Sequence, residues 1–73
     1  MEERKLKLAE ALKEERDRLP EINSFGEKTN FEDYDLAVRY LETGEYPNYY
    51  NDYNLLYGCI EDFEEMCFDY EID

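Results

Sequence analysis

The sequence contains no histidine and no tryptophan, and it has one serine, three glycines and two prolines. Without histidine, and with Ser24 as the single serine, the Ser-His-Asp triad cannot be built. A cysteine nucleophile would lack the histidine that usually serves as its base. Three scattered glycines make no phosphate-binding loop. We therefore expect that the protein is not an enzyme and that it has neither catalytic residues nor a cofactor.

Metal-binding patterns are also missing from the sequence. An EF-hand loop places oxygen ligands at alternating positions before an obligatory glycine, and it ends on a glutamate. The segment 48–54, which is rich in asparagine and tyrosine, does not match that order. A closed zinc site needs cysteine and histidine ligands, and two cysteines alone do not complete one. We expect no dedicated metal site.

The two cysteines, Cys59 and Cys67, are eight positions apart. On one helix their Cα atoms would lie about 12 Å apart, because an α-helix rises about 1.5 Å per residue. A disulfide needs Cα atoms within roughly 7 Å, so we expect two free thiols that are buried as small apolar side chains. The chain shows neither a signal peptide nor an apolar run of about 20 residues. These features predict a cytoplasmic protein in a reducing compartment, with no membrane partner.

Basic residues are scarce after residue 28. Residues 1–28 hold seven Lys/Arg and eight Asp/Glu, a net charge of −1, whereas residues 29–73 hold Arg39 and thirteen Asp/Glu, a net charge of −12. Repulsion among so many like charges destabilises a compact state, which indicates that the excess has a use. Direct binding of nucleic acid is excluded as an interpretation, because it requires a basic surface. The alternative is an acidic surface that serves solubility alone.

Apolar residues make up 42% of the chain and aromatic residues 16%, which is enough to fold residues 1–73 as a single small domain. We predict an all-α fold of three helices, over residues 2–19, 30–43 and 48–70. In the first helix, strong helix formers precede Pro20, and Leu8, Leu12 and Leu19 form one narrow apolar stripe. Its weak heptad-like spacing leaves a homodimer through residues 2–19 as an alternative.

The second helix has signals at both ends. Thr29 and Glu32 have the spacing of a capping box, and Gly44 is typical of a helix C-terminus. Between them, four apolar residues recur on one helical face: Phe31, Tyr34, Val38 and Leu41. In the loop that precedes this helix, residues 20–28, we expect Ile22 and Phe25 to fold back onto the core.

The third predicted helix follows Pro47, a residue suited to a first helical turn. We allow a break near Asn51 and Asp52 or at Gly58. Because tyrosine also favours strands, a short hairpin around residues 45–57, which would make the fold α+β, is the alternative.

This third segment also carries the candidate binding site. On one helix, Glu61, Glu65 and Asp69 would form a row of like charges about 6 Å apart, with no Lys or Arg beside them in sequence. The tyrosines of residues 46–57 alternate with asparagine, a composition that suits adaptable interfaces. The predicted partner-binding residues are Glu45, Tyr46, Tyr49, Tyr50, Asp52, Glu61, Asp62, Glu64, Glu65 and Asp69.

In size, charge and aromatic content the chain resembles the small DNA-mimic inhibitors that phages and mobile elements use against restriction enzymes, CRISPR nucleases and DNA repair glycosylases. The resemblance implies that carboxylates occupy a Lys/Arg-rich groove in the place of phosphates. The expected function is therefore an anti-CRISPR or anti-restriction type of inhibitor that binds a basic protein surface. The alternative is a small helical adaptor or regulator, for example an antitoxin-like protein, that binds a basic segment of another protein.

Overall fold

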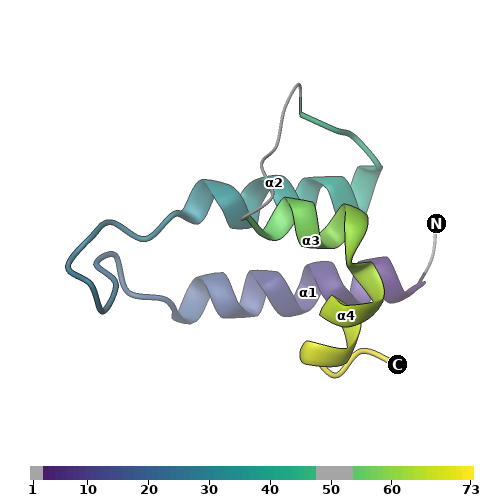
Figure 1. The fold of residues 1–73 in the computed structure, drawn as a ribbon, viewed down its shortest axis with the longest axis horizontal. Helices are drawn as coiled ribbons and strands as arrows, with labels where there is room; N and C mark the ends of the chain where they lie inside the picture. Colours follow the sequence, from purple (N-terminus) through teal and green to yellow (C-terminus); the bar gives the residue numbers. More distant parts are fainter. Residues whose placement is uncertain (1–2, 48–53) are drawn as a thin grey trace.

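The computed structural model describes residues 3–47 and 54–73 of the chain. Within them the chain forms only helices and one isolated β-bridge, which confirms the predicted all-α fold (Figure 1). The helices are α1 (Glu3–Arg18), α2 (Phe31–Thr43), α3 (Leu55–Glu61) and α4 (Phe63–Asp69). None of these helices is long and apolar enough to cross a membrane.

Helices α1 and α2 form a hairpin, and α3 and α4 pack across it (Figure 1). Helix α1 ends before Pro20, as predicted, and the side chains of Leu8 and Leu12 from its apolar stripe are completely buried. They pack with Ala37 and Leu41 of α2 in one core. The four helices therefore share a single apolar centre that α1 and α2 largely build.

The predicted capping box of α2 is wrong, because the helix begins one residue later. Asn30, and not Thr29, is the N-cap, and its side-chain oxygen accepts a hydrogen bond from the Asp33 amide at 3.3 Å. The Thr29 hydroxyl instead donates to the carbonyl of Pro20, which closes the loop between the two helices. The predicted end of α2 is confirmed: Gly44 adopts a left-handed φ of 79°, and its amide donates to the carbonyl of Tyr40.

The prediction of a single third helix is also wrong, because two helices of seven residues each, α3 and α4, take its place. The chain breaks at Asp62, with a φ of −121°, and not at Gly58, whereas the alternative break near Asn51 and Asp52 lies outside the described part of the chain. At Gly58 a Cβ atom would lie 2.6 Å from Sδ of Met66, so the missing side chain allows α4 to fold back closely onto α3. Residues 55–57 of the alternative hairpin are helical, and residues 48–53 lie outside the described part of the chain.

The start of α3 is capped from two directions. The side-chain oxygen of Asn54 accepts from the Tyr57 amide at 2.9 Å, and Oδ2 of Asp33 on α2 accepts from the Leu55 amide at 3.1 Å. The four first amides of a helix have no partner within the helix, so both contacts satisfy groups that would otherwise be left open. Asp33 thereby fixes α3 against the N-terminal end of α2.

The loop between α1 and α2 does not fold back onto the core as predicted. Ile22 is 53% exposed and Phe25 is 83% exposed. The loop is held by its own polar groups, because Oδ1 of Asn23 accepts from the amides of Phe25 and Glu27 at 2.9 and 3.1 Å. Gly26, with a φ of 78°, supplies the tight turn that this arrangement needs. Local hydrogen bonds therefore order the loop without apolar burial.

Both cysteines are free and buried, as predicted, although they lie on different helices. Cys59 on α3 and Cys67 on α4 are each 1% exposed and belong to the apolar core. Burial raises the pKa of the Cys59 thiol to about 12, with a smaller contribution from the carboxylate of Asp33. The thiol of Cys59 therefore stays protonated and unreactive at neutral pH.

Candidate partner-binding surface

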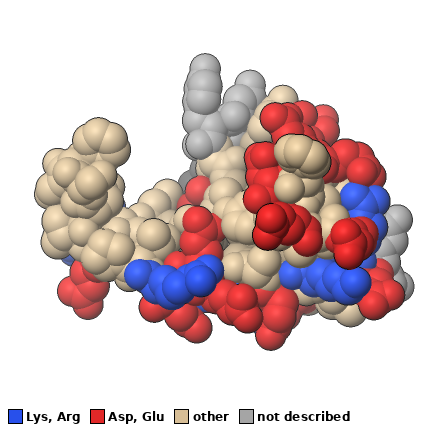
Figure 2. All heavy atoms as spheres, turned by 90° about the horizontal axis from the view of Figure 1, so that it is seen from below, with Lys and Arg blue, Asp and Glu red and all other residues tan. Residues whose placement is uncertain are grey.

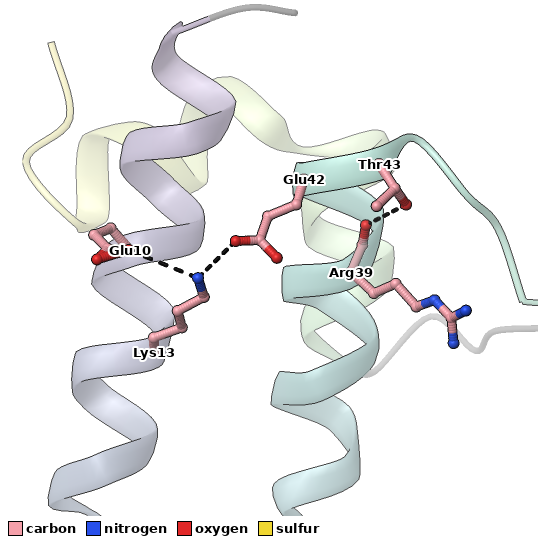
Figure 3. A network of polar contacts seen from close by, with 5 residues as sticks. All are labelled: Glu10, Lys13, Arg39, Glu42 and Thr43. Atoms are coloured by element: carbon pink, nitrogen blue, oxygen red, sulfur yellow. Dashed lines mark hydrogen bonds and ion pairs between the residues drawn. The ribbon is translucent and has the colours of Figure 1, made fainter.

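Three of the cations of α1 form ion pairs with carboxylates of other helices. Three ion pairs join α1 to α2 and α4, with N–O distances of 2.8, 2.6 and 2.8 Å: Arg4 with Glu64, Lys13 with Glu42, and Arg16 with Asp35. Figure 3 shows Lys13 between Glu10 of its own helix and Glu42 of α2. In sequence, the Lys and Arg residues of positions 1–28 nearly balance the acidic residues of the same segment. In the fold, three of these cations pair instead with carboxylates of residues 29–73.

The pair of Arg4 and Glu64 changes the interpretation of one predicted binding residue. The guanidinium donates two hydrogen bonds to the carboxylate, at 3.0 and 2.8 Å, and it lies 5.2 Å from the ring centre of Phe63. Hydrogen bonding to Arg4 lowers the pKa of Glu64, and the same contact raises the pKa of Arg4. Glu64 is therefore already bound by a cation of its own chain, 60 positions away in sequence.

The predicted row of like charges is split between two helices. Glu61 is the last residue of α3, whereas Glu65 and Asp69 lie one turn apart on α4. The predicted row on one helical face is therefore wrong, because the chain changes direction at Asp62. Glu61, Glu65 and Asp69 are all exposed, and so is Asp62 between the two helices.

At this end of the molecule much of the negative charge has no compensating cation. Residues 54–73 contain seven Asp/Glu and no Lys/Arg. Five of these carboxylates are exposed and form no ion pair with any residue that the structure describes: Asp62, Glu65, Asp69, Glu71 and Asp73. Figure 2 shows acidic side chains gathered around uncharged atoms at this end, whereas the lobe at the opposite end is mostly uncharged.

The second group of predicted partner-binding residues comes after α2 in the sequence. Glu45 forms an ion pair with Arg39 at 3.0 Å, and Tyr46 is 61% exposed with its ring centre 5.3 Å from that of Tyr40. The structure brings these two residues near the C-terminal end of α2, but nothing in it joins them to the α3–α4 corner. The remaining predicted residues of this group, Tyr49, Tyr50 and Asp52, lie outside the described part of the chain.

One exposed aromatic residue was missed by the sequence interpretation. Phe68 on α4 is 82% exposed, and helical spacing places it beside Glu64 and Glu65. Its exposure could have been predicted from the sequence, because Phe68 falls outside the apolar stripe that continues through Phe63 and Cys67. An apolar ring among carboxylates provides contact area that charge alone does not supply.

Among the described residues, no group of three or more cysteine, aspartate or glutamate side chains is arranged to hold a metal ion. Comparisons of the chain with protein-family models, with curated proteins and with solved structures find no match.

Proposed function

We propose that this protein binds a Lys/Arg-rich protein surface and acts as a DNA-mimic inhibitor of a nucleic-acid-binding enzyme in the cytoplasm. The observation that carries the proposal is the set of five exposed carboxylates, from Asp62 to Asp73, without an ion pair among the described residues. The protein uses cations at other positions, since Arg4, Lys13 and Arg16 neutralise carboxylates between helices. Glu14, Glu21 and Glu27 also form no ion pair with a described residue, but residues 54–73 contain no Lys or Arg that could balance their carboxylates.

This distribution suits a groove that normally holds a phosphate backbone. Carboxylates around the α3–α4 corner present negative charge from several directions, as a curved surface does, and Phe68 adds an apolar contact among them. Electrostatic attraction would raise the association rate and would weaken as salt increases, because charges are screened over about 8 Å at physiological ionic strength. A binding function of this kind needs neither a metal nor a catalytic residue.

A helical adaptor or regulator, the alternative function, is favoured by a different observation. The loop of residues 20–28 exposes Ile22 and Phe25 at the opposite end of the molecule, on a backbone that Asn23 orders. An ordered loop with an exposed aromatic ring resembles the anchors that dominate many protein–protein interfaces. An adaptor of this kind would bind through apolar contact, and DNA would not compete with it.

The decisive experiment is competition by DNA. The immobilised protein is loaded with proteins from a bacterial lysate, and bound proteins are eluted with sheared duplex DNA or with polyglutamate at equal charge. Elution by DNA of an enzyme whose activity the free protein inhibits supports the proposal. Retention in the presence of DNA supports the adaptor instead.

A matched pair of variants locates the interaction. Replacing Glu65 and Asp69 with Lys adds four charge units at the α3–α4 corner, and replacing Glu21 and Glu27 with Lys adds the same four at the loop. Binding to the captured enzyme is expected to fall by about tenfold or more for the first variant only, because like charges then meet across the interface. Equal losses in both variants would show that net charge matters and that the corner does not.

A further inference from the structure

A groove runs between α1 and the residues that follow α4. Its volume is about 540 Å³, and its apolar lining comes from Leu6 and Ala11 of α1 and from Ile72. Leu6 is 47% exposed, although leucine side chains are usually buried in a small domain. The groove therefore offers apolar surface that residues 3–47 and 54–73 leave uncovered.

The rim of this groove is acidic. Five carboxylates and one cation line it: Glu3, Glu10, Glu14, Glu71, Asp73 and Lys7. Lys7 lies 3.7 Å from Glu3, and Glu10 lies 3.8 Å from Lys13, so these two carboxylates are partly compensated. The other three rim carboxylates form no ion pair with a described residue. The rim thus attracts positive charge on both sides of the apolar lining.

The C-terminal wall is held in place by a Schellman motif. The amide of Ile72 donates to the carbonyl of Cys67 at 2.7 Å, and the amide of Glu71 donates to the carbonyl of Phe68 at 3.2 Å. The hydroxyl of Tyr70 donates to the carboxylate of Glu15 on α1, which ties this wall to the opposite one. Burial of the Tyr70 side chain raises the pKa of its hydroxyl, and the hydrogen bond to Glu15 raises it further. The two walls of the groove are therefore positioned before any partner arrives.

Glu71 occupies the position of the motif that glycine usually takes. Its φ is 58°, a left-handed conformation that is unfavourable for a residue with a side chain. Here the unfavourable residue places a carboxylate on the rim of the groove. Backbone strain at a surface residue is a reason to look for a use of its side chain.

We infer that this groove binds a basic amphipathic segment of a partner protein. An apolar side chain of that segment covers Leu6, Ala11 and Ile72, while its Lys or Arg side chains reach Glu14, Glu71 and Asp73 on the rim. A second copy of this chain is a poor occupant, because two proteins with a net charge of −13 would bring acidic rims together. The inference rests on the proposed affinity for basic proteins and names a second contact surface, which shares Glu71 and Asp73 with the five exposed carboxylates and adds Leu6, Ala11 and Glu14 of α1.

The test uses a synthetic helical peptide of about 14 residues, or roughly four turns, with Lys on one face and Leu on the other. A control peptide keeps every Lys and replaces each Leu with Gln. The ¹⁵N-labelled full chain is titrated with each peptide at low salt. We expect the Leu peptide to bind at least about tenfold more tightly and to shift the amide signals of Leu6, Ala11 and Ile72.

Two triple variants sharpen the test. Replacing Glu14 and Glu71 with Gln and Asp73 with Asn should weaken the Leu peptide about tenfold, because the rim loses its charge. The matched control replaces Glu21, Glu27 and Glu32 with Gln, removes the same number of charges far from the groove, and should keep most of the affinity.

Three outcomes would overturn the inference. They are equal binding of both peptides, signal shifts confined to the α3–α4 corner, and concentration-dependent shifts at the groove without peptide, which would indicate a second copy. The first two leave the proposed function standing, since basic ligands would still bind through charge. Failure of the proposed function looks different: no basic peptide would bind, or binding would not change with salt.

Discussion

The α1–α2 hairpin and the α3–α4 pair carry their acidic side chains in different ways. In the hairpin, helices of 16 and 13 residues are joined by ion pairs such as that of Lys13 with Glu42. In the α3–α4 pair, helices of seven residues each have no cation of their own, and Arg4 of α1 forms an ion pair with Glu64. One region thus uses charge to hold its helices together, and the other presents charge to its surroundings.

The net charge of a sequence segment is therefore a poor guide to the charge on the surface of the folded protein. Residues 1–28 look neutral and residues 29–73 look uniformly acidic. In the fold, cations of the first segment form ion pairs with carboxylates of α2 and α4, so the segment that looks neutral in sequence partly neutralises the acidic one.

The largest effect is expected from truncating core leucines in each region. Leu12 of α1 and Leu56 of α3 are both completely buried, and replacing either with Ala should cost about 3 kcal/mol of unfolding free energy. Because a domain of this size has roughly 3–5 kcal/mol in total, both variants should be largely unfolded. Far-UV circular dichroism during heating measures this. If Leu56→Ala kept a cooperative transition while Leu12→Ala did not, the α3–α4 pair would not belong to the same folding unit.

The next effect concerns the close approach of α3 and α4. Replacing Gly58 with Ala improves helix propensity by up to about 1 kcal/mol, but the new Cβ would lie 2.6 Å from Sδ of Met66. We expect a net loss of about 1 kcal/mol, since Met66 must move within a packed core.

A double-mutant cycle in urea separates the two contributions. In a Met66→Ala background the clash disappears, so Gly58→Ala should become neutral or stabilising. An equal loss in both backgrounds would mean that contact with Met66 is not the reason for the glycine.

A gain in the free energy of unfolding is expected when Glu71, whose φ is 58°, is replaced. Replacing it with Gly should raise the unfolding free energy by about 0.5–1 kcal/mol, because glycine accepts the left-handed conformation without a steric penalty. Chemical denaturation of the variant and of Glu71→Gln measures the difference, and the Gln variant controls for the lost charge. A gain of the same size in both would assign the effect to charge repulsion and not to the backbone.

The smallest effect is the pH dependence of the exposed ion pair between α1 and α4. Hydrogen bonding to Arg4 lowers the pKa of Glu64 from its ordinary value of 4.5 in the folded state. The folded protein therefore binds fewer protons than the unfolded chain, so the pair stabilises the fold above about pH 4.5 and stops doing so as the pH falls through the lowered pKa. Melting temperatures measured below pH 5 should fall less steeply for Glu64→Gln than for the wild type. Glu65→Gln, which leaves the pair intact, should keep the wild-type slope.

Several features of the fold followed from local patterns. The ends of α1 at Pro20 and of α2 at Gly44 were predictable, because proline cannot continue a helix and glycine accepts the left-handed turn that ends one. The break at Asp62 was not, because it depends on how Met66 and Gly58 pack across the corner. For the binding surface, the acidic residues were predictable as a group, but their division between two helices was not.

Residue types and helical spacing were enough to predict an acidic protein with an all-α fold and a buried leucine stripe on α1. Those properties depend on residue types and on helical periodicity, both of which act over a few positions. Only the tertiary structure decided which carboxylates are compensated and where α3 begins. Arg4 meets Glu64 across 60 positions and Asp33 caps Leu55 across 22, and such contacts exist only once packing brings distant helices together.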